Sequence, residues 1–130
     1  MSHWTVAKIE IRNPDIELLR QALMAIAQEL GVNQVVENFE VIGWNGRQHC
    51  QFAIPVQLPY GNGYGVYIDE NGYVKVVVDD HGAPLTAQQF ANKLMQYYTA
   101  LAVVKAAQEL GFTVQSFQQL PQGVLIDLTR

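Results

Sequence analysis

The sequence predicts an α+β fold, in which a single antiparallel sheet has two helices packed on one face. Two segments have helical periodicity, and the segments between them alternate apolar and polar residues around short turns. The pentapeptide Ala-Gln-Glu-Leu-Gly ends both helical segments, at 27–31 and 107–111, and each copy precedes a strand-like segment. We therefore expect the order β-α-β-β-β-β-α-β-β. An internal helix–strand pseudo-repeat would explain the shared pentapeptide, as would the independent origin of two similar helix ends.

Length and composition predict one domain that spans residues 1–130. Of the 130 residues, 49% are hydrophobic and 15% are charged, which is typical of a globular domain large enough to bury a core. The formal net charge is −4, and the eight Lys and Arg residues are scattered. Nucleic acid is therefore not an expected partner, because binding its backbone requires clustered basic residues.

The cellular location expected from the sequence is the cytoplasm. Cys50 is the only cysteine, so no internal disulfide can form. The N-terminus lacks the basic and apolar regions of a signal peptide. No apolar run approaches the roughly 20 residues that cross a bilayer, so we expect no membrane association.

The first strand and the first helix follow from local patterns. Residues 4–11 alternate between an apolar and a mixed face, which predicts a strand with one buried face. Asn13-Pro14 predicts the helix start, with Asn13 as N-cap and Pro14 in the first turn. The helix should end at Gly31. Its expected buried stripe consists of Ile16, Leu19, Leu23, Ile26 and Leu30.

The middle of the chain reads as two hairpins. Asn45-Gly46 predicts a tight turn after a strand at 35–42, and residues 52–58 alternate as a following strand. Pro55 predicts an edge strand or a bulge there, because proline cannot donate to the ladder. Residues 60–65 read as a flexible connection. The second hairpin is expected to have strands at 66–68 and 73–78 and a turn at 69–72.

The last third predicts a long helix and a final hairpin. Thr86 and Gln89 have the spacing of a capping box, which places the helix at about 87–110. Strands at 112–118 and 124–129 should follow, joined by a turn at 120–123. The expected buried stripe of the helix consists of Phe90, Leu94, Tyr97, Leu101 and Val104.

Several segments carry a resemblance to a known family over nearly the whole chain. They are Met1-Ser2-His3, residues 41–47, 64–67 and 71–79, the aromatic residues Phe90, Tyr97 and Tyr98, and residues 111–114 and 123–129. In this order they resemble the small hypothetical proteins of plastid and cyanobacterial genomes, the conserved chloroplast reading-frame type of unknown function, which have other bacterial relatives.

The resemblance implies no biochemical activity, no catalytic residues and no cofactor. Through gene association it points to an ATPase of the AAA type as a partner. The chain departs from its relatives at two positions. Residues 80–83 lack the aromatic residue, often Trp, that relatives tend to carry after the fifth strand, and Gln96 replaces a basic residue. A binding role of either position in relatives would therefore not carry over to this chain.

Asp79, Asp80 and His81 form the best candidate for acid–base or metal chemistry. Two carboxylates beside an imidazole can shift each other's pKa or hold a divalent metal, with His49 as a further ligand. Neighbouring strand residues point to opposite faces, however, so the three need not converge. We regard a solvated turn as the stronger interpretation and predict no metal site.

Two other motifs point to structure rather than chemistry. Arg47, His49 and Cys50 lie close in sequence, but a Cys–His nucleophile pair must face each other, and we expect Cys50 to be a small buried residue. The glycine-rich segment 61–65 lacks the Lys-Ser/Thr of a phosphate-binding loop. A strand follows it rather than a helix N-terminus. We therefore expect no catalytic residue in either motif.

The tyrosines are the candidate ligand-binding residues. If the sheet curves around the long helix, some of them would line a pocket together with the loop at Asp80 and His81. The alternative is ordinary packing in the core and at its rim. The predicted ligand-binding residues are Tyr64, Tyr67, Tyr97, Asp80 and His81.

The stretch from 110 to 126 contains no charged residue. An uncharged hairpin is poorly protected against pairing with another strand, so either another element covers it or it contacts a partner. The predicted interface residues are Gln115, Ser116, Phe117 and Gln118.

The function expected first is therefore that of a small, non-enzymatic interaction or assembly module, which forms a homodimer or binds another protein. A small-molecule binding protein with a cavity between the long helix and the sheet is the second hypothesis. An enzyme that uses Asp79, Asp80 and His81 is the third.

Overall fold

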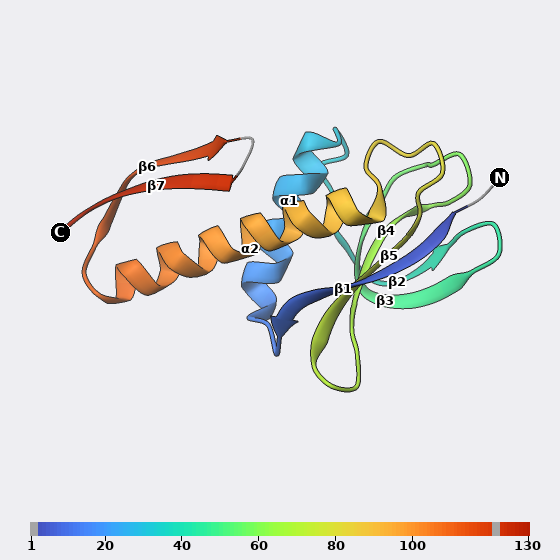
Figure 1. Ribbon diagram of the computed structural model, residues 1–130, viewed down its shortest axis with the longest axis horizontal. Coiled ribbons are helices and arrows are strands. Elements are labelled where there is room, and N and C mark those ends of the chain that lie inside the picture. Colours follow the sequence, from blue (N-terminus) through green and yellow to red (C-terminus); the bar gives the residue numbers. More distant parts are fainter. Residues whose placement is uncertain (1–2, 121–122) are drawn as a thin grey trace.

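The computed structural model describes residues 3–120 and 123–130 and has an α+β fold (Figure 1). Its elements follow one another as strand, helix, four strands, helix and two strands, which is the order expected along the chain. They are β1 (Trp4–Arg12), α1 (Ile16–Glu29), β2 (Val36–Ile42), β3 (Arg47–Pro55), β4 (Gly63–Ile68), β5 (Tyr73–Asp79), α2 (Ala87–Glu109), β6 (Thr113–Leu120) and β7 (Gly123–Thr129). Met1 and Ser2 of the family motif, and Pro121 and Gln122 of the last predicted turn, lie outside the described residues.

The strands form two sheets, so the prediction of a single sheet is wrong. The first five strands make an antiparallel sheet in the order β1-β5-β4-β3-β2, and β6 pairs with β7 in a separate antiparallel hairpin. Helix α2 extends beyond the larger sheet, and the hairpin folds back along it (Figure 1). The strand pattern of a hairpin is the same in either arrangement, so only the packing of α2 decides between them.

Both helices pack on the same face of the five-stranded sheet, as expected. Their apolar stripes enclose the main core together with the inward-facing side chains of β1, β3, β4 and β5. The ring of Tyr64 stacks on that of Phe90 with 4.8 Å between their centroids. The largest fully buried side chains of this core include Leu19, Leu23, Ile26, Ile54, Tyr64, Phe90 and Leu94.

Helix α1 begins at Ile16 rather than at Pro14, so the predicted start is wrong. Its N-cap is Asp15, whose carboxylate accepts a hydrogen bond from the Leu18 N–H at 3.2 Å. Asn13 has a φ of 50°, and its own N–H donates to the Gly72 carbonyl at 2.8 Å. This contact with the turn between β4 and β5 holds Asn13 outside the helix.

The repeated pentapeptide forms the same C-terminal cap on both helices. In α1 the Gly31 N–H donates to the Gln28 carbonyl, and the Val32 N–H donates to the Ala27 carbonyl, both at 3.0 Å. The equivalent bonds at the end of α2 are 3.0 and 2.9 Å long, with Gly111 in the glycine position. This Schellman motif requires a left-handed residue, and the two glycines have φ values of 75° and 87°. The strands that follow enter different sheets, so the likeness is confined to the helix ends.

The five-stranded sheet curls back on itself through the β2–β3 hairpin. Asn38 has a φ of 50° within β2, and the pairing with β3 skips this residue. Beyond it the hairpin contacts β4 and β5. Gly65 lies beneath it, where a Cβ atom would come within 2.5 Å of the Cys50 Sγ and 2.6 Å of the Val41 Cγ2. The buried residues of this second core are Val41, Cys50, Ala53 and Val77.

Pro55 marks neither an edge strand nor a bulge, so that prediction is wrong. β3 lies between β2 and β4, and Pro55 is its last residue, beyond the pairing of β2 that ends at Ala53. Its missing N–H therefore removes no bond between β2 and β3. β4 begins at Gly63, inside the predicted connection. The adjacent Asn62 side chain accepts a hydrogen bond from the Ile42 N–H at 2.8 Å.

Residues 95–130 form a second packing unit, which we call the C-terminal unit. It consists of the later turns of α2 and the β6–β7 hairpin that packs on them. Ala100 and Ala107 are nearly buried here, although neither belongs to the main core. In the part of the chain that the structure describes, neither helix combines the length and apolar character needed to cross a membrane.

Candidate functional site

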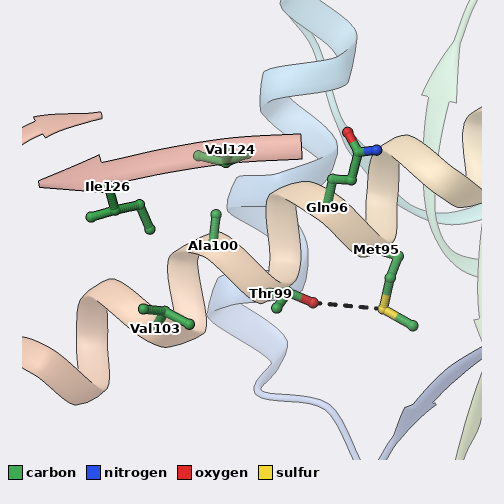
Figure 2. A pocket seen from close by; sticks show the side chains of 7 residues that line it. All are labelled: Met95, Gln96, Thr99, Ala100, Val103, Val124 and Ile126. Carbon is green, nitrogen blue, oxygen red and sulfur yellow. Dashed lines mark hydrogen bonds between the residues drawn. The ribbon is translucent and has the colours of Figure 1, made fainter. Parts of the chain in front are cut away.

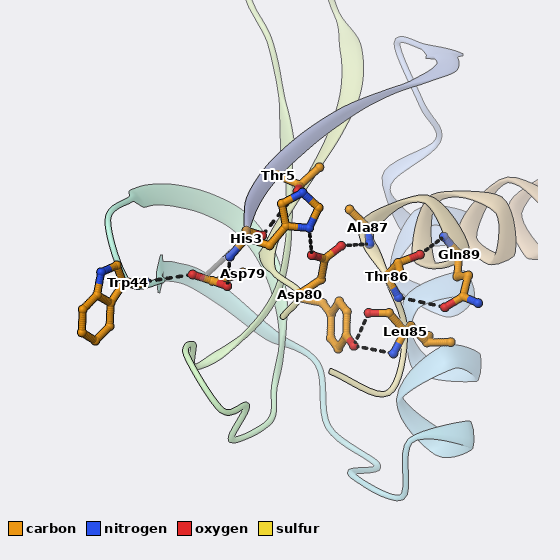
Figure 3. A network of polar contacts seen from close by, with 10 residues as sticks. His3, Thr5, Trp44, Asp79, Asp80, Leu85, Thr86, Ala87 and Gln89 are labelled. Carbon is orange, nitrogen blue, oxygen red and sulfur yellow. Dashed lines mark hydrogen bonds and ion pairs between the residues drawn. The ribbon is translucent and has the colours of Figure 1, made fainter. Parts of the chain in front are cut away.

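Two regions are candidates for function: a carboxylate cluster at the end of β5 and a groove on the C-terminal unit. The cluster contains Asp79 and Asp80, which are 0% and 7% exposed. The β1–β5 register places Trp4 opposite Asp79, so the start of the chain lies beside the two carboxylates. Burying a carboxylate is costly unless its oxygens have donors. All four oxygens have a nitrogen partner (Figure 3).

The Asp79 carboxylate joins separate segments of backbone. Its Oδ1 accepts from the His3 N–H at 2.7 Å, and its Oδ2 accepts from the Trp44 N–H at 3.0 Å. Burial alone would raise the pKa of Asp79. Hydrogen bonds from three backbone N–H groups, the third that of His81, outweigh burial and hold the pKa below its usual value. Asp79 therefore ties β1 and the β2–β3 turn to the end of β5 as an ion.

The Asp80 carboxylate connects the start of the chain to helix α2. Its Oδ1 lies 2.7 Å from the His3 Nδ1, and its Oδ2 accepts from the Ala87 N–H at 2.6 Å. Ala87 is the first residue of α2, where the helix dipole favours a negative charge. The predicted capping box completes this helix end, because Thr86 and Gln89 exchange side chain–backbone hydrogen bonds.

His81 does not join the two carboxylate side chains. Its exposed ring contacts the edge of Tyr60 at 5.2 Å, and Tyr60 contacts Trp44 at 5.8 Å. Within residues 3–120 and 123–130, no group of three His, Cys, Asp or Glu side chains is placed to hold a metal ion. The geometry suits a clasp that joins β1, the β2–β3 turn and α2.

The structure does not bring the predicted tyrosines together. Tyr64 is buried in the main core, where its hydroxyl donates to the Leu85 carbonyl at 2.8 Å and accepts from the Leu85 N–H at 2.9 Å. Tyr67 packs against the second core on the other face of the sheet. Tyr97 lies on α2, and its hydroxyl bonds to Glu29 of α1. These three side chains occupy three different places.

The thiol of Cys50 is shielded from any nucleophilic role. Cys50 is fully buried in the second core, and burial raises the pKa of its thiol to about 12. His49 is exposed, since neighbouring residues of β3 point to opposite faces. A Cys–His pair is therefore not formed, as the sequence led us to expect.

A groove of about 450 Å³ lies between α2 and β7 (Figure 2). None of its lining side chains is charged, and most are apolar. Val103 is 46% exposed at this groove. The lining residues are Met95, Gln96, Thr99, Ala100, Val103, Val124 and Ile126.

Further apolar side chains are exposed around the groove on the C-terminal unit. Leu110 is 67% exposed, Phe117 43% and Leu125 46%. Phe117 pairs with Ile126 in the β6–β7 register, and directly opposed residues share a face. Phe117 therefore lies on the face of the hairpin that is turned toward α2, whereas Leu125 lies on the other face.

The predicted interface residues are all exposed on β6. Gln115, Ser116, Phe117 and Gln118 lie on a strand that pairs with β7 along one edge. The register shifts between Val114 and Ser116, so Gln115 forms a bulge. The Ser116 hydroxyl donates to the Asp127 carboxylate across the hairpin at 2.7 Å.

Sequence reasoning missed His3 and the groove. His3 reaches Asp80 only because β1 pairs with β5, and no local pattern signals that contact. The groove did leave a signal in the sequence. Ala100, Val103 and Ala107 follow a second apolar stripe of α2, spaced by three and four residues.

A comparison with protein families places the chain in a described group. A family model, described as a protein of unknown function (DUF1257), matches residues 26–126. The match extends from the middle of α1 into β7 and so covers both the five-stranded sheet and the C-terminal unit. No curated protein and no solved structure matches the chain. With most of its length matched, the chain belongs to the DUF1257 family of proteins of unknown function.

Proposed function

We propose that this protein is a non-enzymatic interaction module that binds another protein chain through the C-terminal unit. The observation that carries the proposal is the uncharged groove between α2 and β7, with Val103 half exposed within it. Burying exposed apolar surface drives most protein association, and contact surfaces are poor in charge at their centres. Leu110, Phe117 and Leu125 add apolar surface to the same unit.

The carboxylate cluster supports a structural role more than a catalytic one. A general acid or base needs a free oxygen or nitrogen within reach of a substrate. The oxygens of Asp79 and Asp80 are already engaged by donors that hold β1, a turn and a helix start. This arrangement favours an interaction module over an enzyme.

A small-molecule binding protein is the second candidate, and it is supported by the size of the groove. About 450 Å³ falls within the range of roughly 300–1,000 Å³ that is typical of ligand sites. The lining would favour an apolar ligand, with Gln96 and Thr99 as the polar contacts. Such a ligand and a protein partner would compete for the same groove.

A photo-crosslinking amino acid at Val103 tests the proposal inside the cells that produce the protein. Val6 is the matched control, because it is 45% exposed on β1 against 46% for Val103. We expect a protein adduct from position 103 and none from position 6, identified by mass spectrometry. An AAA-type ATPase is one partner to search for, on the resemblance alone.

Three outcomes of this experiment would count against the module. The absence of any adduct at position 103 would overturn it, and equal adducts at both positions would show that the labelling is unspecific. A small-molecule adduct at position 103 would favour the second candidate instead.

A further inference from the structure

We infer that the protein chain bound at the C-terminal unit is a second copy of this chain, joined along the free edge of β7. The inference rests on the proposed function and names its partner. It follows from the position of the groove, from the distribution of charge and from the small size of the hairpin.

The groove opens along the outer edge of β7. Val124 and Ile126 of β7 line it with α2, and no described residue of β6 does so (Figure 2). Among the described residues, β7 pairs with β6 alone, so the backbone groups along its other edge have no strand partner. Such an edge can accept a further strand. An added strand would also cover the groove.

The distribution of charge favours a second copy over a charged partner. The chain has a net charge of −4, so two copies repel each other over most of their surface. The groove lining has no charged residue, nor does the segment from 110 to 126. In β7, Asp127 is the one charged residue, and it accepts a hydrogen bond from Ser116. Asp127 alternates with Ile126 and so points away from the groove.

A two-fold arrangement satisfies both copies in the same way. Antiparallel pairing of two β7 strands gives a four-stranded sheet, which is more stable than an isolated hairpin. A two-fold axis perpendicular to this sheet leaves both α2 helices on the same face. Each helix would then lie beside the central strands, and Val103 of each copy would lie at the contact.

The test is the mass of the purified full-length protein in solution, measured by light scattering and native mass spectrometry over a dilution series. We expect a dimer for the wild type. Val103→Glu and Val103→Lys should each weaken it about tenfold or more, because each places like charges in an apolar contact. An equimolar mixture of the two variants should restore a dimer with one chain of each kind. The same substitutions at Val6 should leave the dimer unchanged.

The outcomes separate this inference from the proposed function. A monomeric wild type overturns the second copy, whereas a position-103 adduct to a different protein would leave the interaction module standing. A dimer that both Val103 variants retain places the contact elsewhere and overturns the inference. Gln118→Lys on β6 distinguishes the two edges of the hairpin. If it dissociates the dimer and the Val103 variants do not, β6 is the contact edge.

Discussion

At the scale of single residues, the structure depends most on a buried carboxylate. Asp79 is fully buried, and its two oxygens accept from backbone N–H groups at 2.7 and 3.0 Å. No water can replace those bonds in a buried site, so the cost of losing one is the cost of an unsatisfied buried donor. The cluster therefore contributes to stability rather than to chemistry.

Asp79→Asn should destabilise the protein by about 1–3 kcal/mol at neutral pH. The amide offers one oxygen where the carboxylate offers two, so one backbone N–H loses its acceptor. Because the folded pKa of Asp79 is depressed, its contribution is present in full above 3.8, the ordinary value. It is lost as the pH falls through the lower folded pKa.

Urea unfolding of both proteins between neutral pH and pH 2 would check this prediction. The difference in unfolding free energy between them should shrink below pH 4. Glu70→Gln, on an exposed side chain in the turn after β4, is the control and should show little difference at any pH. A difference that stays constant with pH would contradict an ionised Asp79.

At the scale of elements, the curl of the sheet depends on a missing side chain in β4. Gly65 leaves room for Cys50 and Val41, which fold over it from β3 and β2. The second core forms only because the β2–β3 hairpin comes this close. Close approach of one backbone to another is a common reason for glycine inside a strand.

Gly65→Ala should destabilise the protein by about 1–3 kcal/mol, because the new methyl group overpacks the second core. The added Cβ would lie 2.5 Å from the Cys50 Sγ, so combining it with Cys50→Ala should cost less than the sum of the two changes. A thermal or urea double-mutant cycle measures this coupling. Strictly additive effects would show that the two residues do not compete for the same space.

At the scale of the whole molecule, two packing units share helix α2. The main core takes Phe90 and Leu94 from its first turns, and none of its buried residues comes after Leu94. The C-terminal unit packs on the later turns and has a hairpin with a single supporting helix. A two-stranded sheet is marginal by itself, so this unit should be the less stable of the two.

Truncation after Phe112 should therefore remove the hairpin and leave the five-stranded sheet folded. The cut keeps the Schellman bonds that end α2, so the helix retains its cap. Cooperative thermal unfolding and slow amide exchange in β5 would confirm the prediction. Loss of both would mean that the hairpin stabilises the main core through α2. The truncated chain should also be monomeric.

Much of the fold could be predicted because it rests on short-range interactions. The apolar stripe of each helix, the capping box at Thr86 and the glycine caps at Gly31 and Gly111 involve residues a few positions apart. The same holds for the tight turns that make neighbouring strands antiparallel. Asn13 is an instructive failure, because a backbone hydrogen bond from a distant turn overrides its local preference.

The sequence by itself determined the fold class, the order of the elements and the helix ends, since these follow from periodicity and from hydrogen bonds between near neighbours. Only the tertiary structure decided that the strands divide into two sheets, that Asp80 meets His3, and that a groove opens beside Val103. The physical reason is the same in each case. These features depend on strand register and helix packing between segments far apart in the chain, which no local pattern encodes.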